Sequence, residues 1–542
     1  MHVFELVIML LLGGAALVAL ARWIGTPYPA LLALGGALLA LVPGTPTIEL
    51  DPELALALFV APVLLDAAFD TSARDLRNQW RPVASMAVGA VVLTVVAVAC
   101  IVHLMIPDMP WAAAIALGAI VAPPDAAAAT AVLRQLRPPH RLLVILEGES
   151  LLNDASALLI YRLAVGVTLS GAALGWNVVP VLLATTVGSV VLALVLARVA
   201  LVTINRIEDV ATAVIVQFCG TFGVWIVADW LHLSPILTMV VYAMTVARTA
   251  PDRTPARIRL PSYAVWEVAV FVLNVLAFIL VGLQLKPIIE GPMHGELRQY
   301  AIVAAATCAT AIVARIVWVT GALAFSRWRC RRHLPAAAQT ELTNISPRGA
   351  AVVAWCGMRG TVTLAAALAL PTGANGTSPF PYRDLILVTA FAVVLGTLVI
   401  QGMTLRPLIR FLDLDADDEV EREVHLARVQ MLEAGLAQTD GAAHSESIEL
   451  LRQRYRLRLR RAQRELQLHM QIAETSIDAI PVDELVADAG IIRAAMSAQR
   501  RRLSALRAAG TIGDDAFHQV EAELDLFELD LEQVLRSVEI RG

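Results

Sequence analysis

Residues Leu146–Asp154 read LEGESLLND and interrupt a long apolar run with acids, a hydroxyl and an amide. Two pairs in this stretch stand four positions apart: Glu149 with Asn153, and Ser150 with Asp154. On a helix these four side chains project into one arc of roughly 140°. Because an ionisable side chain at membrane depth is energetically costly, such a cluster indicates a function. Its side chains offer oxygen ligands, which suit a hard monovalent cation or a proton better than zinc or copper. The alternative to a functional site is that these residues only form polar contacts between helices.

The composition is that of a membrane protein. Of the 542 residues, 58% are hydrophobic and only 16% are charged, and the mean hydropathy is +0.69. The net charge of −5 discriminates little, because it averages an apolar part and a polar tail. The five cysteines are scattered, which indicates neither a disulfide framework nor a CxxC metal site. The first apolar segment lacks the basic residues that open a signal peptide, so we expect it to remain as a membrane helix.

The apolar segments are spaced for about 13 transmembrane helices of roughly 20 residues each. We expect these at 3–20, 28–44, 53–70, 83–105, 111–133, 140–169, 177–203, 208–229, 235–249, 263–288, 299–325, 347–371 and 384–410. Arginines concentrate in alternate short loops, and acids lie in the loops between them. Because an excess of Arg and Lys marks the cytoplasmic side, the N-terminus is predicted outside the cell membrane and the C-terminus in the cytoplasm.

Two of the expected spans contain residues that break helices. In the fifth, Pro123 and Pro124 remove backbone donors, which predicts an open helix or, at the least, a kink. Unwound backbone in a membrane is tolerated only against protein or a water-lined cavity, so Asp125 is expected to face one. In the twelfth, residues 356–360 read CGMRG, where glycines loosen the helix and Arg359 adds a charge. Paired broken helices in inverted repeats are typical of transporters, and the span numbering fits that arrangement approximately.

Arg315 lies in the middle of another apolar span. A guanidinium there requires a carboxylate partner, and Glu149 is the first candidate. This pairing would leave Asp154 as the one free titratable group of the site. A single carboxylate that binds either one Na⁺ or one proton, and is exposed to one side at a time, predicts one-for-one electroneutral exchange.

These motifs together resemble the bacterial sodium/proton exchangers, in the monovalent cation:proton antiporter group that includes the eukaryotic sodium/proton exchangers. Besides LEGESLLND, the likeness rests on four stretches in the family's order and spacing: APPDAAAATAVLRQL, FVLNVLAFILVGLQL at 271–285, ARIVWV around Arg315, and CGMRGTVTLAAAL. It covers roughly residues 5–411. The fold it implies is an all-α polytopic membrane protein with inverted repeats and two crossing broken helices. It also implies a homodimer, each unit having a dimerisation domain and a moving core.

The resemblance assigns roles to six residues: Asp154 carries the ion and the proton, Ser150 is a neighbouring Na⁺ ligand, Asn153 and Glu149 support the site, Glu149 pairs with Arg315, and Arg359 balances helix ends at the crossing. In this family Asn-Asp on the sixth helix marks the electroneutral branch. One departure concerns the first break, where many members have Thr-Asp-Pro. Here the threonine is replaced by Pro124, so a backbone carbonyl would have to serve as the cation ligand beside Asp125. This replacement could shift the preference among Na⁺, Li⁺ and K⁺.

Three further polar residues have two readings each. Asp66 occupies the place where relatives carry an acid that lines the cytoplasmic funnel, and it is equally compatible with an interfacial position near a loop. Glu267 and Asn274 are polar enough to line the interface between core and scaffold, or to serve as ordinary contacts between helices.

The composition changes abruptly after the last span. We divide the chain into a transmembrane antiporter domain, 1–412, and a cytosolic helical tail, 413–542, with helices from about Glu446 to Ala473, 482–509 and 514–537. Its basic and acidic helices most simply pair with one another or with a second subunit, which predicts a regulatory or dimer-contact module. An arginine stripe on the membrane surface is an alternative, and nucleic-acid binding is not expected.

Three classes of function follow from these patterns. The favoured one is a secondary antiporter that exchanges Na⁺ for protons, with Li⁺ or K⁺ as alternative cations. A cation channel is disfavoured because a pore needs several weak sites in file. An intramembrane enzyme is disfavoured because Ser150 has no histidine nearby in the sequence. No cofactor is expected beyond the transported Na⁺ and H⁺.

Overall fold

The computed structural model describes residues 2–43, 52–133, 138–170, 178–254, 256–290, 297–333, 346–372, 379–414, 419–440 and 446–474, with isolated positions 501, 502 and 505. The chain divides into two compact units, residues 1–417 and 418–542. Apart from those isolated positions, the tail helices predicted at 482–509 and 514–537 lie outside the described residues.

In the described ranges every regular element is helical, which confirms the predicted all-α class. The first unit contains α1 (His2–Ile24), α2 (Tyr28–Ala40), α3 (Pro52–Ala55), the π-helical η1 (Leu56–Val60), α4 (Ala61–Asp70), α5 (Ala73–Asn78), α6 (Trp80–Ala84), the π-helical η2 (Ser85–Ala90), α7 (Val91–Met105), α8 (Trp111–Val121), α9 (Ala126–Leu133), α10 (His140–Ser170), α11 (Val178–Ile204), α12 (Val210–Trp230), α13 (Pro235–Arg253), α14 (Ala256–Leu283), α15 (Leu285–Glu290), α16 (Leu297–His333), α18 (Pro347–Trp355), α19 (Thr361–Leu368) and α20 (Arg383–Leu412).

Seven helices in the described part are long and apolar enough to cross a membrane: α1, the continuous run of α6, η2 and α7, and α11, α12, α14, α16 and α20. Shorter apolar helices accompany them, namely α2, the run from η1 into α4, α8 and α13. The chain is therefore a multi-pass membrane protein, and the count of 13 spans stays a prediction.

One span is longer than its hydropathy predicts. The apolar pattern predicts a helix over 299–325, whereas α16 continues to His333. The extension reads SRWRCRRH, and arginine has a good helix propensity, so the helix persists after the apolar run has ended. The two π-helical stretches also have no counterpart in the apolar pattern.

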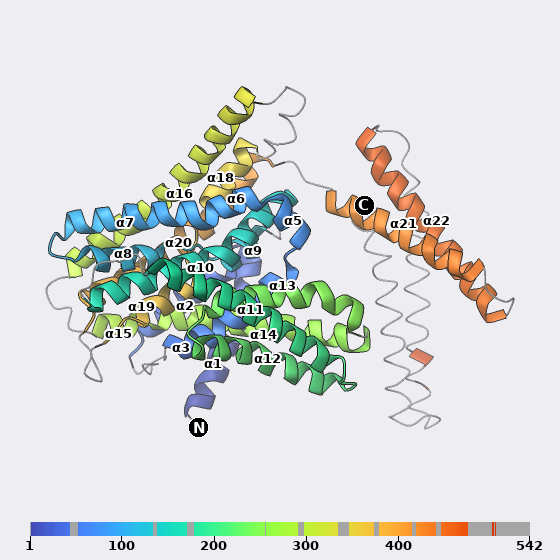
Figure 1. Ribbon diagram of the computed structural model, residues 1–542, viewed down its shortest axis with the longest axis horizontal. Helices are drawn as coiled ribbons and strands as arrows, with labels where there is room; N and C mark the ends of the chain where they lie inside the picture. Colours follow the sequence, from blue (N-terminus) through green and yellow to red (C-terminus); the bar gives the residue numbers. More distant parts are fainter. Residues whose placement is uncertain are drawn as a thin grey trace. The chain divides into compact units, whose positions relative to one another are not determined.

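Small residues let two of these helices approach closely. At the crossing of α2 and α14, a side-chain carbon on Gly36 would overlap the carbonyl of Ile279, and one on Gly282 would overlap the carbonyl of Ala33. Only glycine fits at both positions, which is the small-residue packing common between membrane helices. A second buried core is shared by α7, α8, α10 and α20, and α7 runs beside α8 in Figure 1.

The short helix α5 is tied to the start of α10 by a hydrogen bond between side chains. The His140 Nε2 atom lies 3.2 Å from the Asp75 carboxylate, and the Ser72 hydroxyl accepts the Asp75 backbone N–H as an N-cap. Partial burial raises the pKa of Asp75, but hydrogen bonds from His140, Ser72 and Arg74 outweigh it, so this pKa lies below its ordinary value.

The second unit contains a helical hairpin of α21 (Glu419–Asp440) and α22 (Glu446–Glu474), which lie side by side in Figure 1. Its small apolar core joins Val429 and Leu432 of α21 to Ala462 of α22. Across the pair, the Gln463 amide donates a hydrogen bond to the Glu433 carboxylate at 3.3 Å.

Candidate ion-binding site

The two predicted helix breaks are present and cross each other. The helix α8 ends at Val121 and α9 starts at Ala126, while α18 ends at Trp355 and α19 starts at Thr361. At the crossing, the backbone N–H of Asp125 donates to the carbonyl of Met358 at 2.7 Å. The carboxylate of Asp125 occupies the space that a side chain on Gly360 would need, so glycine is required for this close approach.

Arg359 lies at the crossing and is 1% exposed. Its Nε donates to the Val121 carbonyl at 3.0 Å, and its Nη1 and Nη2 atoms donate to the carbonyls of Gly357 and Ala311. Val121 is the last residue of α8, where the partial negative charge of the helix dipole lies. Arg359 therefore compensates a helix end with a positive charge.

Behind this crossing, α10 presents the acidic cluster. Glu149, Asn153 and Asp154 expose 1%, 0% and 7% of their surface, and Ser150 and Glu147 are half-buried. The apolar sequence around them places this part of α10 in the interior of the first unit, in contact with α8, η2, α9, α13 and α18. The cluster therefore lies within protein rather than on the outer surface.

The expected partner of Arg315 is Glu149. The Arg315 Nη1 and Nη2 atoms donate to the Glu149 Oε1 and Oε2 atoms at 2.5 and 2.8 Å, in a bidentate pair. The Nε of Arg315 donates to the Val353 carbonyl at 3.2 Å, so the pair joins α10, α16 and α18. Since both side chains are buried, their charges neutralise each other within the protein.

Asn153 connects α10 to the first break. Its amide Nδ2 donates to the Pro124 carbonyl at 3.2 Å, so that carbonyl keeps one lone pair for a further donor or cation. The Oδ1 atom of Asn153 is buried and accepts no hydrogen bond from the described residues. A buried acceptor without a donor is an atom that a bound cation could satisfy.

Asp154 is the remaining buried carboxylate of α10. It forms no hydrogen bond or ion pair with another residue in the described ranges, and Asp125 is the charged group that interacts with it electrostatically. The arrangement thus separates one neutralised carboxylate, Glu149, from one uncompensated carboxylate. An uncompensated carboxylate in a buried site favours a bound proton or cation over the empty anionic form.

The other predicted residues lie farther along the scaffold. Asp66 is half-buried on α4, and α14 carries Glu267, which is exposed, and Asn274, which is half-buried. The helices α4 and α14 pack against each other. The roles suggested for these three residues stay predictions.

Two contacts of the site escape sequence reasoning. The Thr397 hydroxyl of α20 accepts the backbone N–H of Arg359 at 3.0 Å, which holds the second break. The Ser156 hydroxyl, two residues after Asp154, donates at 2.6 Å to the Ala87 carbonyl in the π-helical η2. A π-helical turn displaces a carbonyl from the regular ladder, and such turns are frequent at functional sites.

Known proteins are similar to this chain in sequence and in fold. The family described as sodium/hydrogen exchanger, transmembrane, matches residues 7–411. A relative from Mycobacterium tuberculosis, named an uncharacterized Na(+)/H(+) exchanger, is 30% identical over 441 residues, which are 80% of this chain and 79% of the relative. The sodium, potassium, lithium and rubidium/H(+) antiporter of Bacillus subtilis is 30% identical over 397 residues, which are 70% of this chain and 57% of the relative.

The fold itself has a solved counterpart. The sodium proton antiporter MjNhaP1 from Methanocaldococcus jannaschii superposes with a TM-score of 0.58 at 17% sequence identity, over 76% of this chain and 98% of that protein. Because the family match spans nearly the whole first unit, including both broken helices and the acidic helix, the chain belongs to the transmembrane sodium/hydrogen exchanger family.

Proposed function

We propose that this chain is a secondary active transporter that exchanges Na⁺ for H⁺ across the cell membrane by alternating access, with the cation and the proton competing for Asp154. Such exchange would serve sodium and pH homeostasis. The N-terminus would lie outside and the C-terminus in the cytoplasm, as the loop arginines indicate.

The observation that supports this proposal most directly is the bidentate ion pair that neutralises Glu149. Because Arg315 compensates Glu149 through two hydrogen bonds, Asp154 is the buried carboxylate of α10 that remains available for an exchangeable cation. The Asn153 Oδ1 atom and the Pro124 carbonyl supply oxygens close by on the same network, and Ser150 stands one turn before Asp154. Oxygen ligands of this kind suit Na⁺.

The missing threonine leaves the choice of cation as a separate proposal. With Pro124 at the first break, the oxygen offered to the cation is a backbone carbonyl rather than a hydroxyl. We propose Na⁺ as the main substrate and Li⁺ and K⁺ as competitors. A relative named for sodium, potassium, lithium and rubidium supports breadth of this kind in the family.

Proteoliposomes with an imposed pH gradient test the proposal. We expect Na⁺ to dissipate the gradient in the intact chain, and a valinomycin and K⁺ voltage clamp to leave the rate unchanged. Asp154→Asn should abolish the Na⁺ response and leave the protein folded, and Asp229→Asn, which changes an exposed acid at the end of α12, is the matched control. A Na⁺ response that survives in Asp154→Asn would refute Asp154 as the carrier, and a voltage-dependent current in that variant would indicate a pore.

The assembly and the tail complete the proposal. We propose a homodimer of transporter units in the membrane, with residues 413–542 acting as a cytosolic module for regulation or dimer contact. Native mass spectrometry of the purified chain should give twice the mass of one chain, and a monomer in mild detergent at all concentrations would contradict it.

A further inference from the structure

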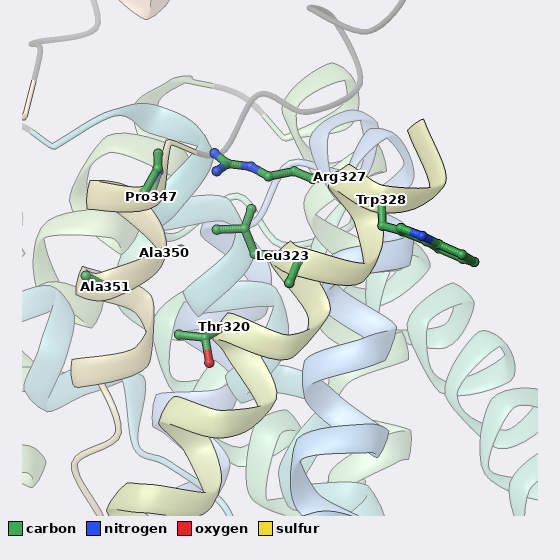
Figure 2. A pocket seen from close by; sticks show the side chains of 8 residues that line it. Thr320, Leu323, Arg327, Trp328, Pro347, Ala350 and Ala351 are labelled. Atoms are coloured by element: carbon green, nitrogen blue, oxygen red, sulfur yellow. The ribbon is translucent and has the colours of Figure 1, made fainter. Parts of the chain in front are cut away.

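A groove separate from the ion site opens between α16 and α18. Its volume is ≈ 430 Å³, and Figure 2 shows residues of α16 on one wall and of α18 on the other. The α16 wall includes Thr320, Leu323 and Ala324, and the α18 wall includes Ala351. The groove lies beyond Arg315 along α16, toward the arginine-rich end of that helix.

The walls of the groove are apolar. Leu323, Ala324 and Ala351 offer only hydrocarbon, and the Thr320 hydroxyl is satisfied within its own helix, where it donates to the Ile316 carbonyl at 2.7 Å. A ligand that fills this space therefore has to be largely hydrocarbon, because a polar one would lose its hydrogen bonds to water.

The rim of the groove is positively charged. The Arg327 side chain reaches across the mouth toward Pro347, as Figure 2 shows, and it pairs with no carboxylate among the described residues. Pro347 is the first residue of α18, so the positive end of that helix dipole lies at the same rim. Ser346 caps this helix end by accepting the Gly349 N–H, so α18 contributes its dipole and the Arg327 guanidinium is the hydrogen-bond donor; together they favour a phosphate group.

The groove opens onto the face of α16 that is exposed in the first unit. Ala324 and Trp328 continue a stripe with Val313 and Val317, whose exposed fractions are 56% and 55%. In a membrane-spanning helix an apolar exposed stripe faces lipid, and a tryptophan at its end is typical of the membrane–water interface. Arginines at this end mark it as cytoplasmic, where anionic lipids attract basic side chains.

We propose that this groove binds one anionic phospholipid, with its phosphate at Arg327 and the N-terminus of α18 and an acyl chain along Leu323, Ala324 and Ala351. A free phosphate would leave the apolar walls unused, and a zwitterionic lipid would gain less from the basic rim. The lipid would wedge between the two helices that Arg315 already joins through the Val353 carbonyl, so membrane composition would act on the helices around the ion site.

Native mass spectrometry of the full chain in mild detergent tests the assignment with phosphatidylglycerol and phosphatidylcholine of identical acyl chains. We expect one phosphatidylglycerol to be retained more tightly than phosphatidylcholine. Arg327→Gln should weaken phosphatidylglycerol binding by roughly fivefold and leave phosphatidylcholine unchanged, because one interfacial basic residue contributes about that factor. Arg206→Gln, an exposed arginine after α11 on the same predicted side, is the matched control and should leave both lipids unchanged.

Two further arms make the test decisive. Ala324→Phe fills the groove from an exposed position and should weaken both lipids, which identifies the acyl chain as part of the ligand. Equal losses of phosphatidylglycerol from Arg327→Gln and Arg206→Gln would overturn the proposal, since binding would then follow general surface charge. Displacement of the lipid by millimolar inorganic phosphate alone would also overturn it, in favour of a free-anion site.

Discussion

The buried pair between Glu149 and Arg315 offers the most quantitative test of the site. Glu149→Gln keeps the shape of the side chain but removes its charge, which leaves the Arg315 guanidinium, 3% exposed, without a counter-charge. The neighbouring Arg359 guanidinium repels it further. Removal of one partner of a buried ion pair costs roughly 3–5 kcal/mol of folding stability, so we expect a loss of that size.

The double variant Glu149→Gln with Arg315→Met separates this charge effect from lost packing. With both charges removed, the stability should return to within about 2 kcal/mol of the intact chain, because a buried pair and a neutral replacement of similar volume are often equivalent. The coupling between the two positions should therefore be large and compensating, as expected for residues in direct contact.

The assay is the free energy of unfolding of the purified chain in mild detergent, measured with increasing denaturant for the two single variants and the double variant. If both single variants lose less than about 1 kcal/mol in the free energy of unfolding, the argument is refuted, because an unpaired charge in the interior should destabilise the folded chain by more than that. A double variant as unstable as the sum of the singles would refute it as well. Exchange activity retained by the stable double variant would assign Glu149 a supporting role and leave Asp154 as the carrier.

Three other predictions follow from single positions. Asn153→Asp adds a second carboxylate beside Asp154, so we expect exchange that moves net charge and that a voltage clamp accelerates. An exchange rate that the clamp leaves unchanged in flux assays would contradict the argument that one carboxylate makes the exchange electroneutral. The pKa of Asp75 is lowered in the folded chain, so its stabilising effect is present above its ordinary pKa of 3.8 and is lost as the pH falls through the lower folded value. Asp75→Asn should therefore lower the thermal unfolding temperature at pH 7 and not at about pH 2. Equal losses at both pH values would exclude this linkage. In Gly36→Leu the new side chain meets the backbone of α14, which should destabilise the chain by ~1–3 kcal/mol. Gly166→Leu is the control and should be tolerated, because no atom lies within 4 Å of a side-chain carbon added there. The free energies of unfolding of the two variants are compared by denaturant unfolding.

The sequence predicts those parts of the site where a residue type is energetically unfavourable in a continuous membrane helix. Two consecutive prolines, and a pair of glycines around an arginine, disfavour a continuous helix, so both breaks can be predicted from the sequence. A guanidinium inside an apolar span needs acceptors, a carboxylate being the strongest, and the acidic helix offers Glu149, so the pairing with Arg315 is also predictable. Each inference starts from residue types that are costly in the membrane interior, even where, as for Glu149 and Arg315, the two residues lie 166 positions apart.

The remaining contacts depend on how distant helices meet. The hydrogen bond from Asn153 to the Pro124 carbonyl joins residues 29 positions apart, and that from the Arg359 backbone to Thr397 spans 38. Neither threonine nor serine is unusual in a membrane helix, so Thr397 and Ser156 carry no signal of their role. The π-helical stretches follow from packing rather than from composition, which is why the apolar pattern predicts ordinary helices there.

The charges around the crossing suggest why the two ions would be coupled. The charges of Glu149 and Arg315 cancel, and under the proposed function Asp154 is the group whose occupancy changes the total charge of the site. A carrier with Na⁺ on Asp154 and one with a proton on Asp154 then have the same net charge, whereas the empty carrier has one negative charge more. Movement of that buried, uncompensated carboxylate through the membrane interior is the costly step, so the unloaded carrier would cross far less often than either loaded form. Tight coupling and electroneutrality would then have one origin, the neutralisation of Glu149 by Arg315. In a variant that gives the site a second group of variable charge besides Asp154, we expect more Na⁺ to leak without protons moving in the opposite direction.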